Sequence, residues 1–126
     1  MTVREKVAIL RQSDYLIASI RSDLTDTEVI ALRDELVAAV GRHRIRGIVV
    51  DVTALDVIDS FIARSLQAVA QTARLRGAET IIVGIQPEVA IAMVHFNLEL
   101  EPLRTAIDLD EGLALLRSSP RRSDLG

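Results

Sequence analysis

The sequence contains no cysteine and no tryptophan, and Lys6 is the single lysine among its fifteen basic residues. Without cysteine there can be no disulfide, thiolate nucleophile or cysteine-zinc site. A Walker-type phosphate loop needs a lysine after its glycines, and this chain has no such lysine. One tyrosine and two phenylalanines are too few for stacking nucleic-acid bases. The core must therefore be built from aliphatic side chains.

Long apolar runs and an excess of positive charge are also absent. The longest apolar run, Val89–Val94, is far shorter than the roughly twenty residues that cross a bilayer. The N-terminus lacks the apolar centre of a signal peptide. Fifteen basic and eighteen acidic residues give a net charge of −3, unlike the basic surplus of a nucleic-acid binder. We expect a protein that binds neither membrane nor nucleic acid, and the absence of cysteine fits a reducing compartment such as the cytoplasm.

The length of 126 residues is typical of one domain that buries an adequate core without a metal or disulfide. The chain shows no internal repeat and no linker that would divide it. Residues 118–126 are polar and rich in residues that break helices and strands. We therefore predict a single domain over residues 1–117 and a disordered tail over residues 118–126.

Predicted strands and helices alternate along the chain. A hairpin is expected first, followed by three further strands, at Val7–Arg11, Tyr15–Ile20, Gly47–Val52, Thr80–Val83 and Thr105–Ile107. Helices are expected after a capping box of Thr25 and Glu28, from about Ser60 to Gly77, from Pro87 to about Phe96, and after Asp108, with Gly41 as the stop of the first. This order predicts an α/β fold with a mostly parallel sheet, an N-terminal antiparallel edge strand and about four helices.

The histidines and the clustered arginines have ordinary structural explanations. His43 is expected at the end of a helix, where a cation interacts favourably with the helix dipole. His95 is expected to be partly buried or at a rim, and neither histidine has a second one at metal-binding spacing, so we predict no metal site. The segment from Arg42 to Arg46, with arginine at every second position, is interpreted as a solvated loop in preference to a phosphate or nucleic-acid patch.

Three aspartates, Asp51, Asp56 and Asp59, cluster where the central strand is expected to end. Ligand sites of open α/β sheets lie at the carboxyl ends of strands, so a metal or general-acid role is conceivable. No histidine, cysteine or lysine lies nearby to complete a catalytic set. The favoured interpretation is that these residues cap the next helix and shape its loop, and we predict no catalytic residue and no cofactor.

Ser60 lies at the junction of this loop with the second predicted helix. On the local pattern, Asp59 or Ser60 is the helix N-cap. The hydroxyl of Ser60 could also accept a phosphate, because a helix N-terminus presents free N–H groups and a positive dipole end. A dianion close to Asp56 and Asp59 would change the local charge sharply, as a switch requires. Both interpretations can hold together.

The order of elements, with the sequence DVTALDVIDSF at residues 51–61, resembles the STAS domain of bacterial anti-sigma-factor antagonists. The sequence GIQPEVA at residues 84–90 and TAIDLDEGL at residues 105–113 are similar to the stressosome branch of that family. The resemblance extends from about Val7 to Leu116. The length, without an added sensor domain, is similar to the RsbS-like members of that branch.

This resemblance implies a non-enzymatic scaffold that sequesters a serine kinase. RsbS-like proteins assemble with RsbR-like STAS proteins and hold an RsbT-like kinase until stress triggers phosphorylation. The phosphorylated serine of the family corresponds to Ser60, within the matching residues DSFIA at 59–63. The resemblance further implies a partner-binding surface that includes Asp56, Asp59, Ser60, Gly84 and Pro87, and a possible homo-oligomer.

Three alternatives remain from the sequence. The chain could bind an anti-sigma-factor kinase directly, as RsbV-like antagonists do, with Ser60 serving the same role. It could be a small α/β enzyme or nucleotide-binding domain that uses Asp51, Asp56 and Asp59. It could also be a structural domain in which Ser60 is only a helix cap.

Overall fold

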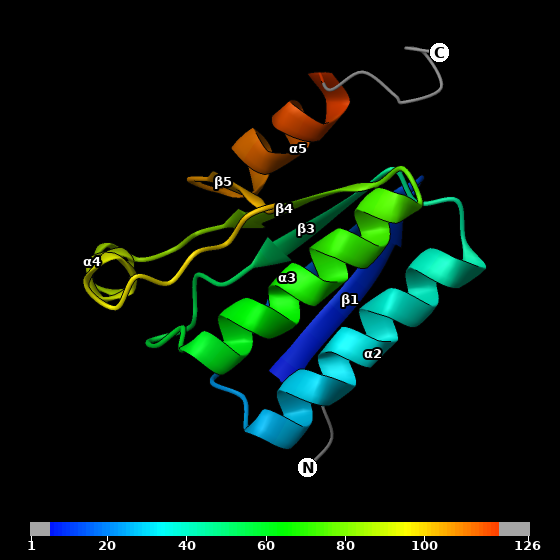
Figure 1. Cartoon of the computed structure of the whole chain (residues 1–126). Helices are drawn as coiled ribbons and strands as arrows, with labels where there is room; N and C mark the ends of the chain where they lie inside the picture. The colour runs from blue at the N-terminus through cyan, green and yellow to red at the C-terminus, as the bar shows by residue number, and fades with distance from the viewer. Residues whose placement is uncertain (1–5, 119–126) are drawn as a thin grey trace.

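The computed structural model describes residues 6–118, which form a five-stranded mixed sheet with helices on both faces (Figure 1). The elements in chain order are β1 (Val7–Gln12), β2 (Tyr15–Ile20), α2 (Asp26–Arg42), β3 (Gly47–Asp51), α3 (Ser60–Leu75), β4 (Glu79–Val83), α4 (Pro87–His95), β5 (Arg104–Ala106) and α5 (Leu109–Ser118). The predicted element order and fold class are confirmed. Residues 119–126, to which the predicted disordered tail belongs, lie outside the described residues, whereas Ser118 ends α5.

The strands follow the order β1-β2-β3-β4-β5 across the sheet. β1 pairs antiparallel with β2, from Val7 opposite Ile20 to Gln12 opposite Tyr15. The other pairs are parallel, with Val49 between Ile17 and Ile81 at the centre. The predicted N-terminal edge strand is therefore confirmed. A parallel sheet places the carboxyl ends of β2 to β5 at one edge, and the β3–α3 and β4–α4 loops begin at this edge.

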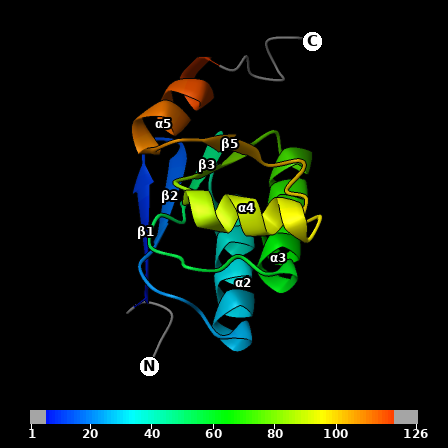
Figure 2. The ribbon, with the colours of Figure 1, turned by 90° about the vertical axis from the view of Figure 1, so that its left-hand side faces the viewer.

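The sheet separates two hydrophobic cores. Helices α2 and α3 pack side by side on one face, and α5 covers the other face over β3, β4 and β5 (Figures 1 and 2). Ile48 and Val50 of β3 face the larger core, together with Leu36 of α2. Val49 faces the smaller core beside Leu116 of α5. The apolar run of β3 therefore arises because this strand is buried on both faces.

The first helix begins with the predicted capping box. The Thr25 hydroxyl accepts the Glu28 N–H at 3.2 Å, and the Glu28 carboxylate accepts the Thr25 N–H at 2.8 Å. The Lys6 ammonium also donates to Glu28 at 2.8 Å. The hydrogen bond from Lys6, followed by that from Thr25, lowers the pKa of Glu28 from 4.5 to about 2.

The end of α2 differs from the prediction. Gly41 was the expected stop, but the helix continues to Arg42, and His43 is the C-terminal cap. A glycine ends a helix when it takes a left-handed conformation, and Gly41 does not have a positive φ. Gly77 and Gly84 do, with φ of 83° and 82°. Within residues 6–118, no helix is long and apolar enough to cross a membrane.

Candidate functional site

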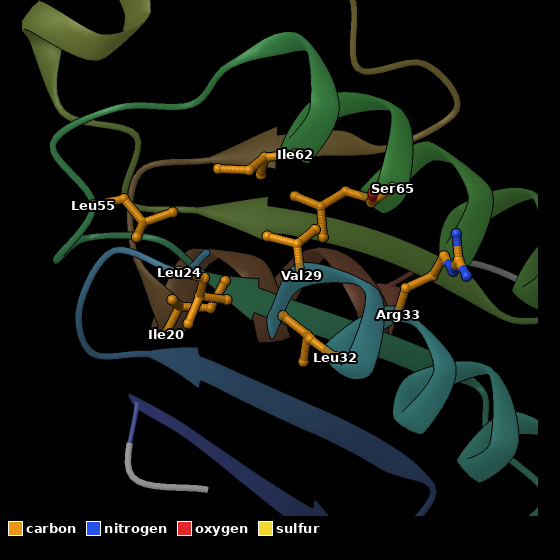
Figure 3. Close-up of a pocket in the computed structure, with 9 residues that line it drawn as sticks. Ile20, Leu24, Val29, Leu32, Arg33, Leu55, Ile62 and Ser65 are labelled. Atoms are coloured by element: carbon orange, nitrogen blue, oxygen red, sulfur yellow. The ribbon is translucent and has the colours of Figure 1, made fainter. Parts of the chain in front are cut away.

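Buried leucine and isoleucine side chains anchor the loop between β3 and α3. Leu55 is 1% exposed and Ile58 is 5% exposed, and both belong to the large core. Figure 3 shows Leu55 and Ile62 facing Ile20 and Leu24 across a cavity between α3 and α2. The cavity measures about 10 Å³, which is room for one water at most. The apolar side chains around the cavity therefore hold the loop and the two helices together, and the cavity is too small for a ligand.

A hydrogen-bonded joint fixes the first part of the same loop. The Asp51 carboxylate accepts the N–H of Thr53 at 2.9 Å and its hydroxyl at 2.6 Å. The side-chain amide of Gln86 donates to the Thr53 carbonyl, which ties the loop to the segment before α4. Gly84 lies against Thr53 and Asp51 so closely that a Cβ there would overlap the Thr53 hydroxyl. Gly84, a predicted partner-binding residue, is thus part of this joint.

Asp59 and Ser60 have separate roles at the start of α3. Asp59 is the N-cap, and its carboxylate accepts the Ile62 N–H at 2.9 Å. Ser60 is the first helical residue, and its side chain is exposed. In the described part of the chain no hydrogen bond engages the Ser60 hydroxyl. Of the two cap assignments left open by the sequence, Asp59 is therefore correct, and the exposed serine oxygen takes no part in the cap.

An open groove with a volume of about 430 Å³ runs from Ser60 to α4. Its floor includes the buried side chains of Ile58 and Val89. Two strongly exposed apolar side chains flank the floor, Val57 at 58% and Phe96 at 70%. Figure 2 shows α4 lying across the molecule in front of α2 and α3. The groove is therefore an apolar surface directly beside a free hydroxyl.

Acidic residues border this groove. Asp56 and Asp59 both line it, and Asp56 is exposed. The Asp56 N–H donates to the carboxylate of Asp23, which follows β2, at 3.4 Å. The groove therefore combines apolar walls with negative charge, an arrangement suited to a protein segment with apolar and basic residues. Neither Phe96 nor Val57 was predicted as a site residue: Phe96 belongs to no sequence motif, and Val57 lies within the motif at residues 51–61 without a polar group to mark it.

The structure also places the remaining candidate residues. Pro87 is exposed at the first position of α4, while Gly84 is turned toward Thr53, so neither is among the residues that line the groove with Ser60. His43 caps α2, as expected for a helix end, and His95 is exposed beside Phe96, with ring centroids 5.2 Å apart. Within residues 6–118, no group of three histidine or acidic side chains is arranged to hold a metal ion.

The three aspartates of the enzyme hypothesis have different roles in the structure. Asp51 is bound to Thr53, Asp59 caps α3, and Asp56 lies at the rim of the groove. Asp56 and Asp59 therefore line the groove, whereas Asp51 belongs to the hydrogen-bonded joint with Thr53. This arrangement favours a binding surface over a set of catalytic carboxylates.

Comparison with known proteins finds domains of similar sequence and fold. The sequence model of the STAS domain matches residues 6–111. A serine-to-glutamate variant of RsbS from Moorella thermoacetica is 34% identical, with a TM-score of 0.77, over 89% of this chain and 95% of that one. A chain in a solved structure of the stressosome, described as a signal integration and transduction hub, is 32% identical, with a TM-score of 0.68. The match covers 87% of this chain and 96% of that one.

A longer relative is also similar. The RsbT co-antagonist protein RsbRA of Bacillus subtilis strain 168 is 28% identical over 82 residues, which is 65% of this chain and 30% of RsbRA. The chain therefore spans less than a third of the length of this curated relative.

Proposed function

The chain belongs to the STAS-domain family and is related to RsbS and to stressosome components, and from this membership we propose that it is a cytoplasmic, non-enzymatic scaffold that sequesters a serine kinase. In this proposal it assembles with RsbR-like STAS proteins and binds an RsbT-like kinase. Phosphorylation of Ser60 then releases the kinase. The observation that carries the proposal is the free, exposed hydroxyl of Ser60 beside an apolar groove.

The groove supplies the docking surface for the kinase. Val57 and Phe96 expose apolar surface that a protein partner would cover, and aromatic side chains are common anchors at such interfaces. Asp56 and Asp59 would pair with basic residues at the rim. Because Ser60 is at the same groove, the kinase would bind next to the residue that it modifies.

Charge provides the release step. A phosphoserine adds about −1.5 to −2 charges at pH 7. On Ser60 this charge would stand beside Asp59 and at the groove that Asp56 also lines. An interface that fits the neutral hydroxyl would then face repulsion and the cost of desolvating a dianion. We expect an affinity loss of about 5- to 150-fold, the usual range of coupling between two binding events.

Phosphosite mass spectrometry tests the switch. The chain is incubated with ATP and the cognate kinase, in parallel with Ser60→Ala and the control Ser22→Ala. Ser22 is exposed and follows β2 at the same edge of the sheet. We expect one phosphate on the wild-type chain and on Ser22→Ala, and none on Ser60→Ala. Stoichiometric phosphorylation of Ser60→Ala would show that the assigned residue is wrong.

Substitution of Phe96 tests the groove separately from the switch. Phe96→Ala should weaken binding of the unphosphorylated chain to the kinase, because Phe96 forms an exposed wall of the groove. Leu75→Ala is the matched control, since Leu75 is 89% exposed and lies at the far end of α3. Equal binding of both variants would mean that the kinase docks elsewhere.

Capture experiments distinguish the partner. Recovery of RsbR-like proteins in a particle of very high mass supports the stressosome assignment. Recovery of an anti-sigma-factor kinase alone would instead support the RsbV-like alternative, in which the same serine serves a different partner.

A further inference from the structure

Three loops meet at the end of the sheet opposite to Ser60. The N–H of Arg46 donates to the carbonyl of Asp14 in the β1–β2 turn at 2.7 Å. The carbonyl of Arg46 accepts the N–H of Glu79, which follows the α3–β4 loop, at 3.1 Å. These bonds fasten the β1–β2 turn, the α2–β3 loop and the α3–β4 loop to one another. Their side chains consequently share one surface.

This surface carries four exposed arginines, which we call the arginine end: Arg11, Arg42, Arg44 and Arg76. Among the residues 6–118, no carboxylate forms an ion pair with any of them. The two acids of the same loops are already engaged, Asp14 by Arg46 at 3.6 Å and Glu79 by Arg104 at 2.7 Å. The arginine end therefore has uncompensated positive charge on a chain whose net charge is negative.

Helix dipoles account for only part of this cluster. Arg42 is in the last turn of α2, where a cation is favourable. Arg11 belongs to β1 and donates to the ring of His43 at 3.2 Å, and Arg44 lies beyond the helix. Several like charges on one surface repel one another, and an anionic partner would relieve that repulsion.

The opposite end of the same molecule has the complementary charge. Its exposed aspartates, which we call the acidic end, are Asp23, Asp26, Asp56 and Asp59. These four carboxylates give the end a negative charge, although Arg21 is an exposed cation there. Because α2 and α3 run in the same direction, their N-termini lie at the acidic end and their C-termini at the arginine end (Figure 1).

We propose that the arginine end binds the acidic end of a second copy of this chain, so that copies associate head to tail. Each copy has both surfaces, and a head-to-tail contact can therefore repeat into rings or open chains. The contact is electrostatic and between exposed groups, so salt weakens it. The contact requires neither a kinase nor phosphorylation, but Asp56 and Asp59 also border the groove proposed for the kinase, so a docked kinase and a second copy would compete for the acidic end.

Sedimentation velocity of the full chain tests the contact at about 50 mM and at about 500 mM NaCl, conditions that shorten the Debye length from more than 10 Å to less than 5 Å. We expect the mean mass to rise with protein concentration at low salt. At high salt the dissociation constant should increase by about tenfold or more. Monomers at every concentration in low salt, or self-association that is insensitive to salt, would overturn the proposal.

Two neutralising variants locate the surfaces. The arginine-end variant combines Arg42→Gln, Arg44→Gln and Arg76→Gln. The acidic-end variant combines Asp23→Asn, Asp26→Asn and Asp56→Asn, which leaves the cap Asp59 and Ser60 intact. Each variant alone should be monomeric. An equimolar mixture should form a dimer that does not grow, because only one intact pair of ends remains.

The control variant Arg33→Gln removes a charge in the middle of α2, away from both ends, and should associate like the wild-type chain. Circular dichroism verifies that every variant is folded. Self-association of the arginine-end variant at the wild-type level, or a mixture that stays monomeric, would show that the copies do not meet head to tail.

Discussion

The separation of Asp59 and Ser60 at the start of α3 leads to a quantitative prediction about folding. The Asp59 carboxylate holds the Ile62 N–H at 2.9 Å, whereas no described residue bonds to the Ser60 hydroxyl. Loss of an N-cap side chain costs about 0.5–2 kcal/mol. Removal of an exposed hydroxyl without a partner changes stability by less than about 0.5 kcal/mol. Asp59→Ala should therefore destabilise the domain by about 1 kcal/mol, and Ser60→Ala should be nearly neutral.

Thermal and urea unfolding can resolve this difference. For a chain of 126 residues, 1 kcal/mol lowers the melting temperature by about 4 °C. Asp59→Asn is the matched control, because asparagine is an equally good N-cap. It should retain most of the stability that Asp59→Ala loses. A loss of 1 kcal/mol or more in Ser60→Ala would refute the cap assignment, and so would an Asp59→Ala variant as stable as the wild type.

Three further predictions concern the fold. Thr80→Val should stabilise the domain by about 1 kcal/mol in urea unfolding, because the buried Thr80 hydroxyl has no hydrogen-bond partner among residues 6–118; a destabilised variant would contradict this. The stability supplied by Glu28 should be present above pH 4.5 and lost as pH falls toward 2, because its pKa is lowered in the folded state; urea midpoints of Glu28→Gln should therefore change less between pH 6 and pH 3 than those of the wild type. Gly84→Ala should destabilise by about 2 kcal/mol or more, since φ is 82° and a Cβ would overlap Thr53, and a wild-type melting temperature would refute this.

The fold could be predicted from the sequence because its local signals agree with one another. The run that became β3 is apolar at successive positions, and only a strand buried on both faces requires this pattern. Thr25 and Glu28 identified the start of α2 by their own chemistry. The end of α2 was predicted at Gly41, two residues before the actual cap, His43. The prediction was wrong because glycine permits a helix end without imposing one.

The site was only partly predictable, because surfaces are formed by residues distant in sequence. Asp59 and Ser60 could be proposed from one local motif. Phe96 lies 36 positions from Ser60, just after α4, and nothing in its neighbourhood marks it as a groove wall. The arginine end shows the same limitation. The sequence revealed the arginines from 42 to 46, while Arg11 and Arg76 join them only through the packing of three loops.

The division of work between Asp59 and Ser60 explains how this position can be modified without damage to the fold. A serine that caps a helix gives its oxygen to a backbone N–H, and a phosphate on that oxygen would disturb the cap. Here Asp59 supplies the cap, so the hydroxyl next to it carries no structural duty. The loop itself is held by Leu55 in the core and by the Asp51–Thr53 joint, both independent of Ser60. A charge added to Ser60 would consequently leave the domain folded.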